Sequence, residues 1–123
     1  MVVIIRLQNG FTVAFYSETA LSFTPDFENK AAALIGVTTK KSFYLRSNMR
    51  QAVIYKYDPY YLEVGNSDLR IEINAKECVA ATNLGKRHAY YDIKDSKVPQ
   101  DIFGTEEREA KVECYEVFQL MLQ

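Results

Sequence analysis

Tryptophan is absent from this chain, histidine occurs once and cysteine occurs twice. His88 is therefore the one candidate base for a Ser-His-Asp or Cys-His site, and no Gly-x-Ser-x-Gly motif accompanies it. Cys78 and Cys114 are far apart and lack the paired spacing of a zinc site. These shortages predict a protein that is not an enzyme and that holds no metal or cofactor.

Long hydrophobic runs are also missing, since no apolar stretch approaches the roughly 18 residues that a membrane-spanning helix needs. The start, Met1 to Arg6, lacks the basic region and cleavage site of a signal peptide. We therefore expect a cytoplasmic protein with free thiols and no membrane insertion. The chain has fifteen Lys and Arg and sixteen Asp and Glu, which gives a net charge of −1. This balance argues against nucleic-acid binding.

Apolar residues make up 48% of the 123 residues, with nine Tyr, seven Phe and only five Gly. Aromatic residues suit the pleated surface of a sheet. The absence of linkers and repeats predicts a single domain, residues 1–123. Many short strands at regular spacing predict a mainly β (β-rich α+β) fold, an antiparallel sandwich or barrel.

The expected strands follow apolar runs and turn signals along the chain. Asn9-Gly10 is the strongest hairpin signal because both residues tolerate positive φ, and Leu69, Ile71 and Ile73 alternate with polar residues on one face. A helix is expected at 105–110, a helical turn at 30–34 and a loop at 23–30. The strands are expected at residues 2–7, 11–16, 42–45, 52–57, 60–64, 68–74, 78–81, 88–93 and 111–122.

Two charged features are candidates for a specific structural or binding role. Lys86, Arg87 and His88 form a small basic turn that would receive an acidic partner, although a solvated turn is the simpler interpretation. In a regular final strand, Glu116 shares a face with apolar Val112. Either a bulge resets the register near Tyr115, or the carboxylate points inward and is hydrogen-bonded there.

The order of short motifs resembles the TLDc domain, in a shortened version most like those of protists. The matching runs are 2–10, 42–45, 61–71, Thr82-Asn83-Leu84-Gly85 with Tyr90-Tyr91, Ile102-Phe103-Gly104-Thr105, and Cys114-Tyr115-Glu116-Val117-Phe118. The resemblance singles out as structural or family-motif residues Gly10, Gly65, Asp68, Gly85, Gly104, Glu116, Val117 and Phe118.

The chain departs from the TLDc pattern in two ways. The opening helix and strands of the family have no counterpart before Met1, and Val13-Ala14-Phe15-Tyr16 stands where the family has Phe-Gly-Gly-Phe/Tyr. Without the opening strands, the apolar segment 2–7 would be an open sheet edge that only Arg6 protects with a charge. We therefore expect a partner or a second copy to pair beside residues 2–7 or to pack over them, with strand addition as the favoured mode.

The resemblance implies an antiparallel two-sheet sandwich with one or two short helices, without a catalytic site, that binds a large protein partner. TLDc proteins are associated with the vacuolar proton-pumping ATPase and with oxidation resistance. One alternative is a structural component of a large cytoskeletal or ciliary assembly. A second alternative is a redox protein that uses Cys78 or Cys114, which would need a cation or helix N-terminus to depress the thiol pKa.

Overall fold

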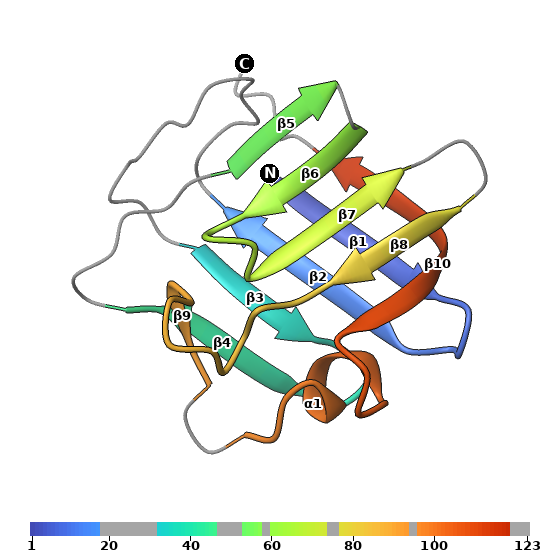
Figure 1. Ribbon diagram of the computed structural model, residues 1–123. Helices are drawn as coiled ribbons and strands as arrows, with labels where there is room; N and C mark the ends of the chain where they lie inside the picture. The colour runs from blue at the N-terminus through green and yellow to red at the C-terminus, as the bar shows by residue number, and fades with distance from the viewer. Residues whose placement is uncertain (18–31, 47–52, 58–59, 74–76, 94–95, 119–123) are drawn as a thin grey trace.

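A computed structural model describes residues 1–17, 32–46, 53–57, 60–73, 77–93 and 96–118, with the backbone alone for 53–57, 60, 61 and 73 (Figure 1). The expected loop at 23–30 lies outside these residues. In chain order the elements are β1 (Val2–Leu7), β2 (Thr12–Ser17), β3 (Ala32–Gly36), β4 (Lys41–Leu45), β5 (Val53–Tyr57), β6 (Tyr60–Val64), β7 (Leu69–Ile73), β8 (Cys78–Ala81), β9 (Tyr91–Asp92), α1 (Gln100–Phe103) and β10 (Glu109–Phe118).

The fold is mainly β, as predicted: one antiparallel sheet and, among the described residues, a single short helix. Nine strands of four or more residues and the two-residue β9 join in the order β5-β6-β7-β8-β10-β1-β2-β3-β4-β9. All of them belong to one hydrogen-bonded sheet, and the two-sheet sandwich of TLDc type stays a prediction.

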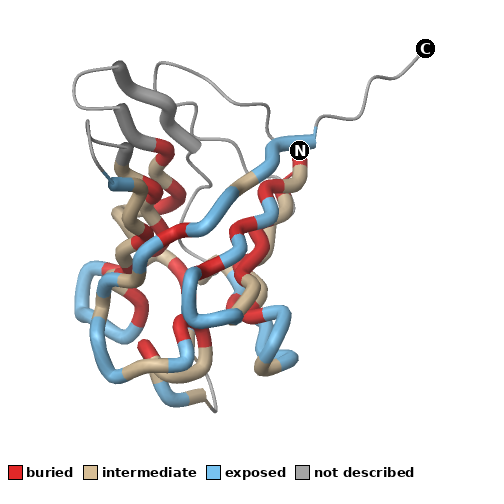
Figure 2. Tube along the Cα trace, turned by 90° about the vertical axis from the view of Figure 1, so that its right-hand side faces the viewer, coloured by how far each residue is buried: buried red, intermediate tan, exposed pale blue. Residues whose placement is uncertain are grey.

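Strand β10 connects the two halves of the sheet. Its first residues, 109–111, pair with β8, whereas residues from Val112 onward pair with β1. Figures 1 and 2 show the β5–β8 half lying in front of the β1–β4 half. Both halves contribute side chains to one core, including Ile5 and Phe15 from one half and Leu69 and Ile71 from the other. Burial of this shared core is the main force holding the fold.

Two strand predictions are confirmed in detail. β1 and β2 pair around Asn9 and Gly10, and Gly10 has a φ of +92° in the turn. Leu69 and Ile71 of β7 are both buried, as the alternation predicts, while the side chain of Ile73 is outside the described set. The remaining described strands lie within or beside the predicted ranges, except β3, for which no strand was predicted.

The predicted positions of the helices are wrong. Residues 109 and 110, expected to be helical, pair with Ala81 and Ala80 in the sheet. Ala33 and Leu34 were expected in a helical turn, but they pair with Tyr16 and Phe15. Tertiary pairing has overridden local helix propensity in both places. The helix that forms, α1, begins after Pro99 and ends before Gly104, whose backbone is left-handed. Proline near the start of a helix and glycine just after its end are typical boundary residues.

Strand β1 is not a sheet edge. β10 pairs with it on one side and β2 on the other. The expectation that a partner adds a strand at residues 2–7 is therefore corrected, because both rows of backbone hydrogen-bonding groups are used within the chain. Binding at this strand would have to use its side chains.

The end of β10 resolves the question posed by Glu116. The pairing shifts between Arg6, which faces Cys114, and Leu7, which faces Val112, so Glu113 is an extra residue in a β-bulge. Beyond the bulge Glu116 is exposed. The predicted bulge is therefore present, two residues before Tyr115, and the alternative of an inward, hydrogen-bonded Glu116 is wrong.

Candidate functional site

The buried carboxylate of Asp68 organises the turn between β6 and β7. Its Oδ1 accepts hydrogen bonds from the backbone N–H groups of Asn66 (2.9 Å) and Tyr90 (3.1 Å), and its Oδ2 accepts one from Tyr91 (2.7 Å). Gly65 begins this turn with a φ of +64°. A Cβ atom at Gly65 would lie 2.6 Å from Oδ1 of Asp68, so the turn needs glycine for both conformation and space.

Two opposing effects act on this carboxyl group. Burial raises the pKa of Asp68 above its ordinary value, because it disfavours the charged form. The hydrogen bonds from the backbone of Tyr91, Tyr90 and Asn66 act in the opposite direction without cancelling the effect of burial. A buried carboxyl group with three donors converging on it is a structural anchor, since removing it would leave those donors without an acceptor.

A second set of hydrogen bonds ties the segment after β8 to the same turn. The hydroxyl of buried Thr82 donates to the carbonyl of Asp68 (2.6 Å) and accepts from the N–H of Leu84 (3.1 Å). The amide of Asn66 donates to the carbonyl of His88 (3.2 Å). Arg108 donates to the carbonyls of Leu84 (2.7 Å) and Thr82 (3.3 Å). The segment 82–91 is thus fixed from both sides.

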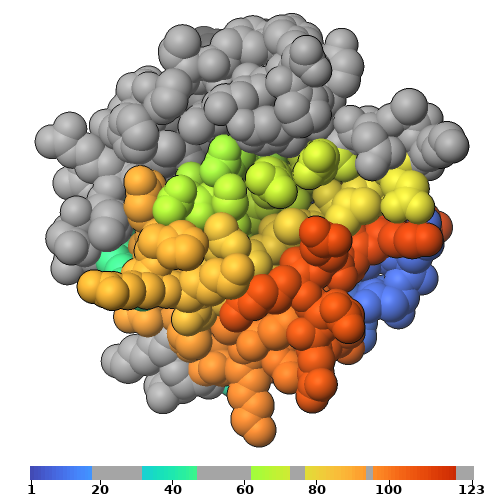
Figure 3. Space-filling view, in the orientation of Figure 1, coloured from blue at the N-terminus to red at the C-terminus, as the bar shows by residue number. Residues whose placement is uncertain are grey.

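This segment carries the predicted basic turn. Lys86, Arg87 and His88 are all exposed, and their backbone is closed by hydrogen bonds from Lys86 N–H to the carbonyl of Asn83 and from Ala89 N–H to that of Lys86. The segment lies at the surface, after β8, on the left of Figure 3. The guanidinium of Arg108 adds a further positive charge at its start. Lysine and arginine side chains form charge-assisted hydrogen bonds with carboxylates.

The other residues that the resemblance singles out do not join this cluster. Gly10 and Gly104 lie in turns with positive φ, while Glu116, Val117 and Phe118 are exposed at the end of β10. Gly85 immediately precedes the basic turn. Sequence reasoning missed Arg108 altogether, because its partners Thr82 and Leu84 are more than twenty residues away and no local pattern connects them.

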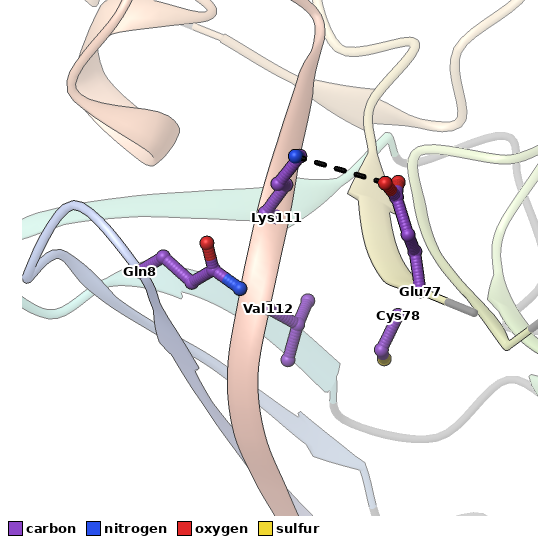
Figure 4. Close-up of a pocket in the computed structure, with 5 residues that line it drawn as sticks. All are labelled: Gln8, Glu77, Cys78, Lys111 and Val112. Carbon is purple, nitrogen blue, oxygen red and sulfur yellow. Dashed lines mark ion pairs between the residues drawn. The ribbon is translucent and has the colours of Figure 1, made fainter.

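A separate pocket of about 310 Å³ lies beside the junction of β8 and β10 (Figure 4). Lys111 and Glu77 form an ion pair at 3.6 Å, and Cys78 is also among the residues that line the pocket. Burial raises the pKa of Cys78, which favours the unreactive thiol over the thiolate. Cys78 and Cys114 are both free. The pocket is lined by Gln8, Glu77, Cys78, Lys111 and Val112.

In the part of the chain that the structure describes, no group of three or more His, Cys, Asp or Glu residues could hold a metal ion. The described residues also include no helix long and apolar enough to cross a membrane. The chain matches no family model, no curated protein and no solved structure.

Proposed function

We propose that this protein is a non-enzymatic protein-interaction module whose basic turn, Lys86 to His88, binds an acidic surface of a large protein partner. The observation that carries the proposal is the combination of exposure and fixed backbone at this turn. Three cationic or titratable side chains project to solvent, while the Asp68 and Arg108 hydrogen bonds hold the chain beneath them.

A fixed backbone favours binding because less conformational entropy is lost when a partner docks. Arg87 supplies a planar guanidinium that suits a bidentate contact with a carboxylate, and Lys86 supplies a mobile ammonium group. The whole chain has a net charge of −1, so attraction to an acidic partner would come from this local group of cations. Local charge of this kind sets orientation and association rate.

We further propose that the chain is a TLDc-type module that forms a two-sheet sandwich. Its large partner would be the vacuolar proton-pumping ATPase, or it would act in oxidation resistance. Three of the runs that carry the resemblance meet at one place: the Gly65–Asp68 turn, the Thr82–Gly85 segment and Tyr90-Tyr91 are joined by hydrogen bonds to Asp68. Their meeting supports a common structural purpose for these motifs. The raised pKa of Cys78 speaks against a redox role for that residue.

Carbodiimide cross-linking in native cell extract tests the proposal directly, because it joins lysine amines to carboxylates that they contact. We expect a cross-link from Lys86 to Asp or Glu of a captured protein. The double variant Lys86→Glu/Arg87→Glu should reduce capture of that protein at least tenfold. A matched control, Lys41→Glu/Lys97→Glu, reverses two exposed lysines elsewhere and should leave capture unchanged.

Equal capture by the wild type and the Lys86→Glu/Arg87→Glu variant would contradict the proposal. An equal loss of capture in both double variants would also contradict the proposal. Such a result would show that binding responds to net charge and does not need the basic turn.

A further inference from the structure

The turn between β1 and β2 is fastened to the C-terminal end of α1. The side-chain amide of Asn9 donates a hydrogen bond from Nδ2 to the carbonyl of Phe103 (2.8 Å), and its Oδ1 accepts one from the N–H of Phe11 (3.0 Å). A Cβ atom at Gly104 would lie 2.5 Å from the ring of Phe11, so this ring packs directly on the glycine. We call the Asn9–Phe103 hydrogen bond and the Phe11–Gly104 contact the turn–helix clasp.

Asn9 is also the only one of the six asparagines in the chain that precedes a glycine. An asparagine loses its amide when the next backbone nitrogen attacks its Cγ atom. Glycine in the next position favours this attack, because it has no side chain to obstruct it. Asn9 and Gly10 are both exposed, and no atom lies within 4 Å of a Cβ added at Gly10. Water and hydroxide therefore reach this turn.

We infer that Asn9 is a site of spontaneous deamidation, that the turn–helix clasp holds the reaction back, and that the reaction breaks the clasp. In the first step hydroxide removes the proton of the Gly10 N–H, the nitrogen bonds to Cγ of Asn9, and the side-chain nitrogen leaves as ammonia. In the second step water adds to the cyclic imide and opens it. The product has aspartate or isoaspartate in place of Asn9.

The folded chain engages the three atoms on which this reaction depends. The attacking nitrogen of Gly10 donates its N–H to the carbonyl of Leu7 (3.0 Å). The departing nitrogen of Asn9 is bonded to Phe103, and the carbonyl oxygen of the same amide is bonded to Phe11. Attack on Cγ requires the side chain to turn toward Gly10, so these hydrogen bonds must first open. Local opening of this kind precedes exchange and modification in folded proteins.

The product cannot form the clasp again. A carboxylate accepts hydrogen bonds but has no proton to donate to the carbonyl of Phe103. Its negative charge would also lie beside that carbonyl oxygen. Isoaspartate further lengthens the backbone of the turn by one carbon atom. Because ammonia is lost, the change runs in one direction, and each molecule that opens for long enough loses the link between the first hairpin and α1.

Peptide mapping by mass spectrometry tests the site itself. The full chain is incubated at mildly alkaline pH, both folded and unfolded in guanidinium chloride. In the unfolded chain Asn9 should react fastest of the six asparagines, and Gly10→Ala should slow its reaction at least tenfold. In the folded chain Asn9 should react at least tenfold more slowly than in the unfolded chain. Equal rates in the two states, or a faster reaction at another asparagine of the unfolded chain, would overturn the inference.

Two glycine variants separate the clasp from overall stability. Gly104→Ala places a methyl group against the ring of Phe11 at a φ of +72°, and it should speed deamidation of Asn9 in the folded chain. Gly65→Ala is the matched control, because its φ is +64° and its Cβ would lie 2.6 Å from Asp68 in the β6–β7 turn. It should change the rate at Asn9 much less. Equal acceleration by both variants would show that only global unfolding exposes Asn9.

Hydrogen exchange tests the consequence without a change of any glycine. Asn9→Asp reproduces one product of the reaction. The amides of Phe103 and Gly104 are hydrogen-bonded to carbonyls one turn earlier (2.8 and 2.9 Å), and in this variant they should exchange at least tenfold faster. The amide of Asp68, bonded within the β6–β7 turn (3.0 Å), should keep its rate. Unchanged exchange at Phe103 and Gly104 would contradict the breaking of the clasp.

Discussion

The β6–β7 turn and the end of β10 each place a carboxylate next to apolar strand residues, with opposite results. Asp68 is buried and accepts three backbone hydrogen bonds. Glu116 is exposed, because the bulge at Glu113 shifts which side chains face the core. The comparison teaches that a carboxylate is buried where backbone donors converge on it, and that apolar neighbours in sequence do not suffice.

Asp68→Ala tests the buried side of this comparison and should have the largest effect. It leaves three backbone N–H groups without their acceptor, at about 1–3 kcal/mol for each stranded donor. We expect a loss of about 3 kcal/mol or more in the free energy of unfolding, measured by urea denaturation. A loss below about 1 kcal/mol would show that water replaces the carboxylate and that Asp68 does not anchor the turn.

Gly65→Ala sharpens the role of the same turn. The new Cβ would combine a left-handed backbone with an approach of 2.6 Å to Asp68, so we expect a loss of roughly 2 kcal/mol in the same measurement. Gly10→Ala is the control, since its φ is also positive but no atom lies within 4 Å of the added Cβ. A smaller loss at Gly65 than at Gly10 would refute the steric argument.

Glu116→Ala tests the exposed side and should have the smallest effect. Glu116 and Glu113 are both exposed, so each alanine variant should unfold within about 0.5 kcal/mol of the wild type. The two urea midpoints should coincide. A midpoint clearly lower for Glu116→Ala than for Glu113→Ala would restore the sequence-based expectation of a structural role for Glu116.

Local patterns predicted the elements in which backbone preference and burial agree. The Asn9-Gly10 hairpin and the alternation of β7 belong to this group, because turn chemistry and a two-residue period both act over a few neighbouring positions. Patterns failed at residues 32–34 and 109–110. Alanine and glutamate there favour a helix, but pairing with distant strands decides the conformation.

The candidate site divides in the same way. Lys86, Arg87 and His88 could be identified as a basic turn from their order alone, and Asp68 could be singled out as part of a motif. The support from Arg108 could not be predicted, since its hydrogen bonds to Leu84 and Thr82 depend on how β10 begins beside β8. A side chain that satisfies distant carbonyls leaves no periodic signal in the sequence.

The sequence by itself determined a mainly β chain with balanced charge, a first hairpin and an exposed basic turn, because these follow from composition and short-range chemistry. Only the tertiary structure decided that β1 lies inside the sheet, that Glu116 faces solvent and that Asp68 anchors the turn beneath the basic residues. Strand order, the position of a bulge and the convergence of backbone donors all depend on contacts between residues far apart in the chain. Such contacts form only when the core between the two halves of the sheet is buried.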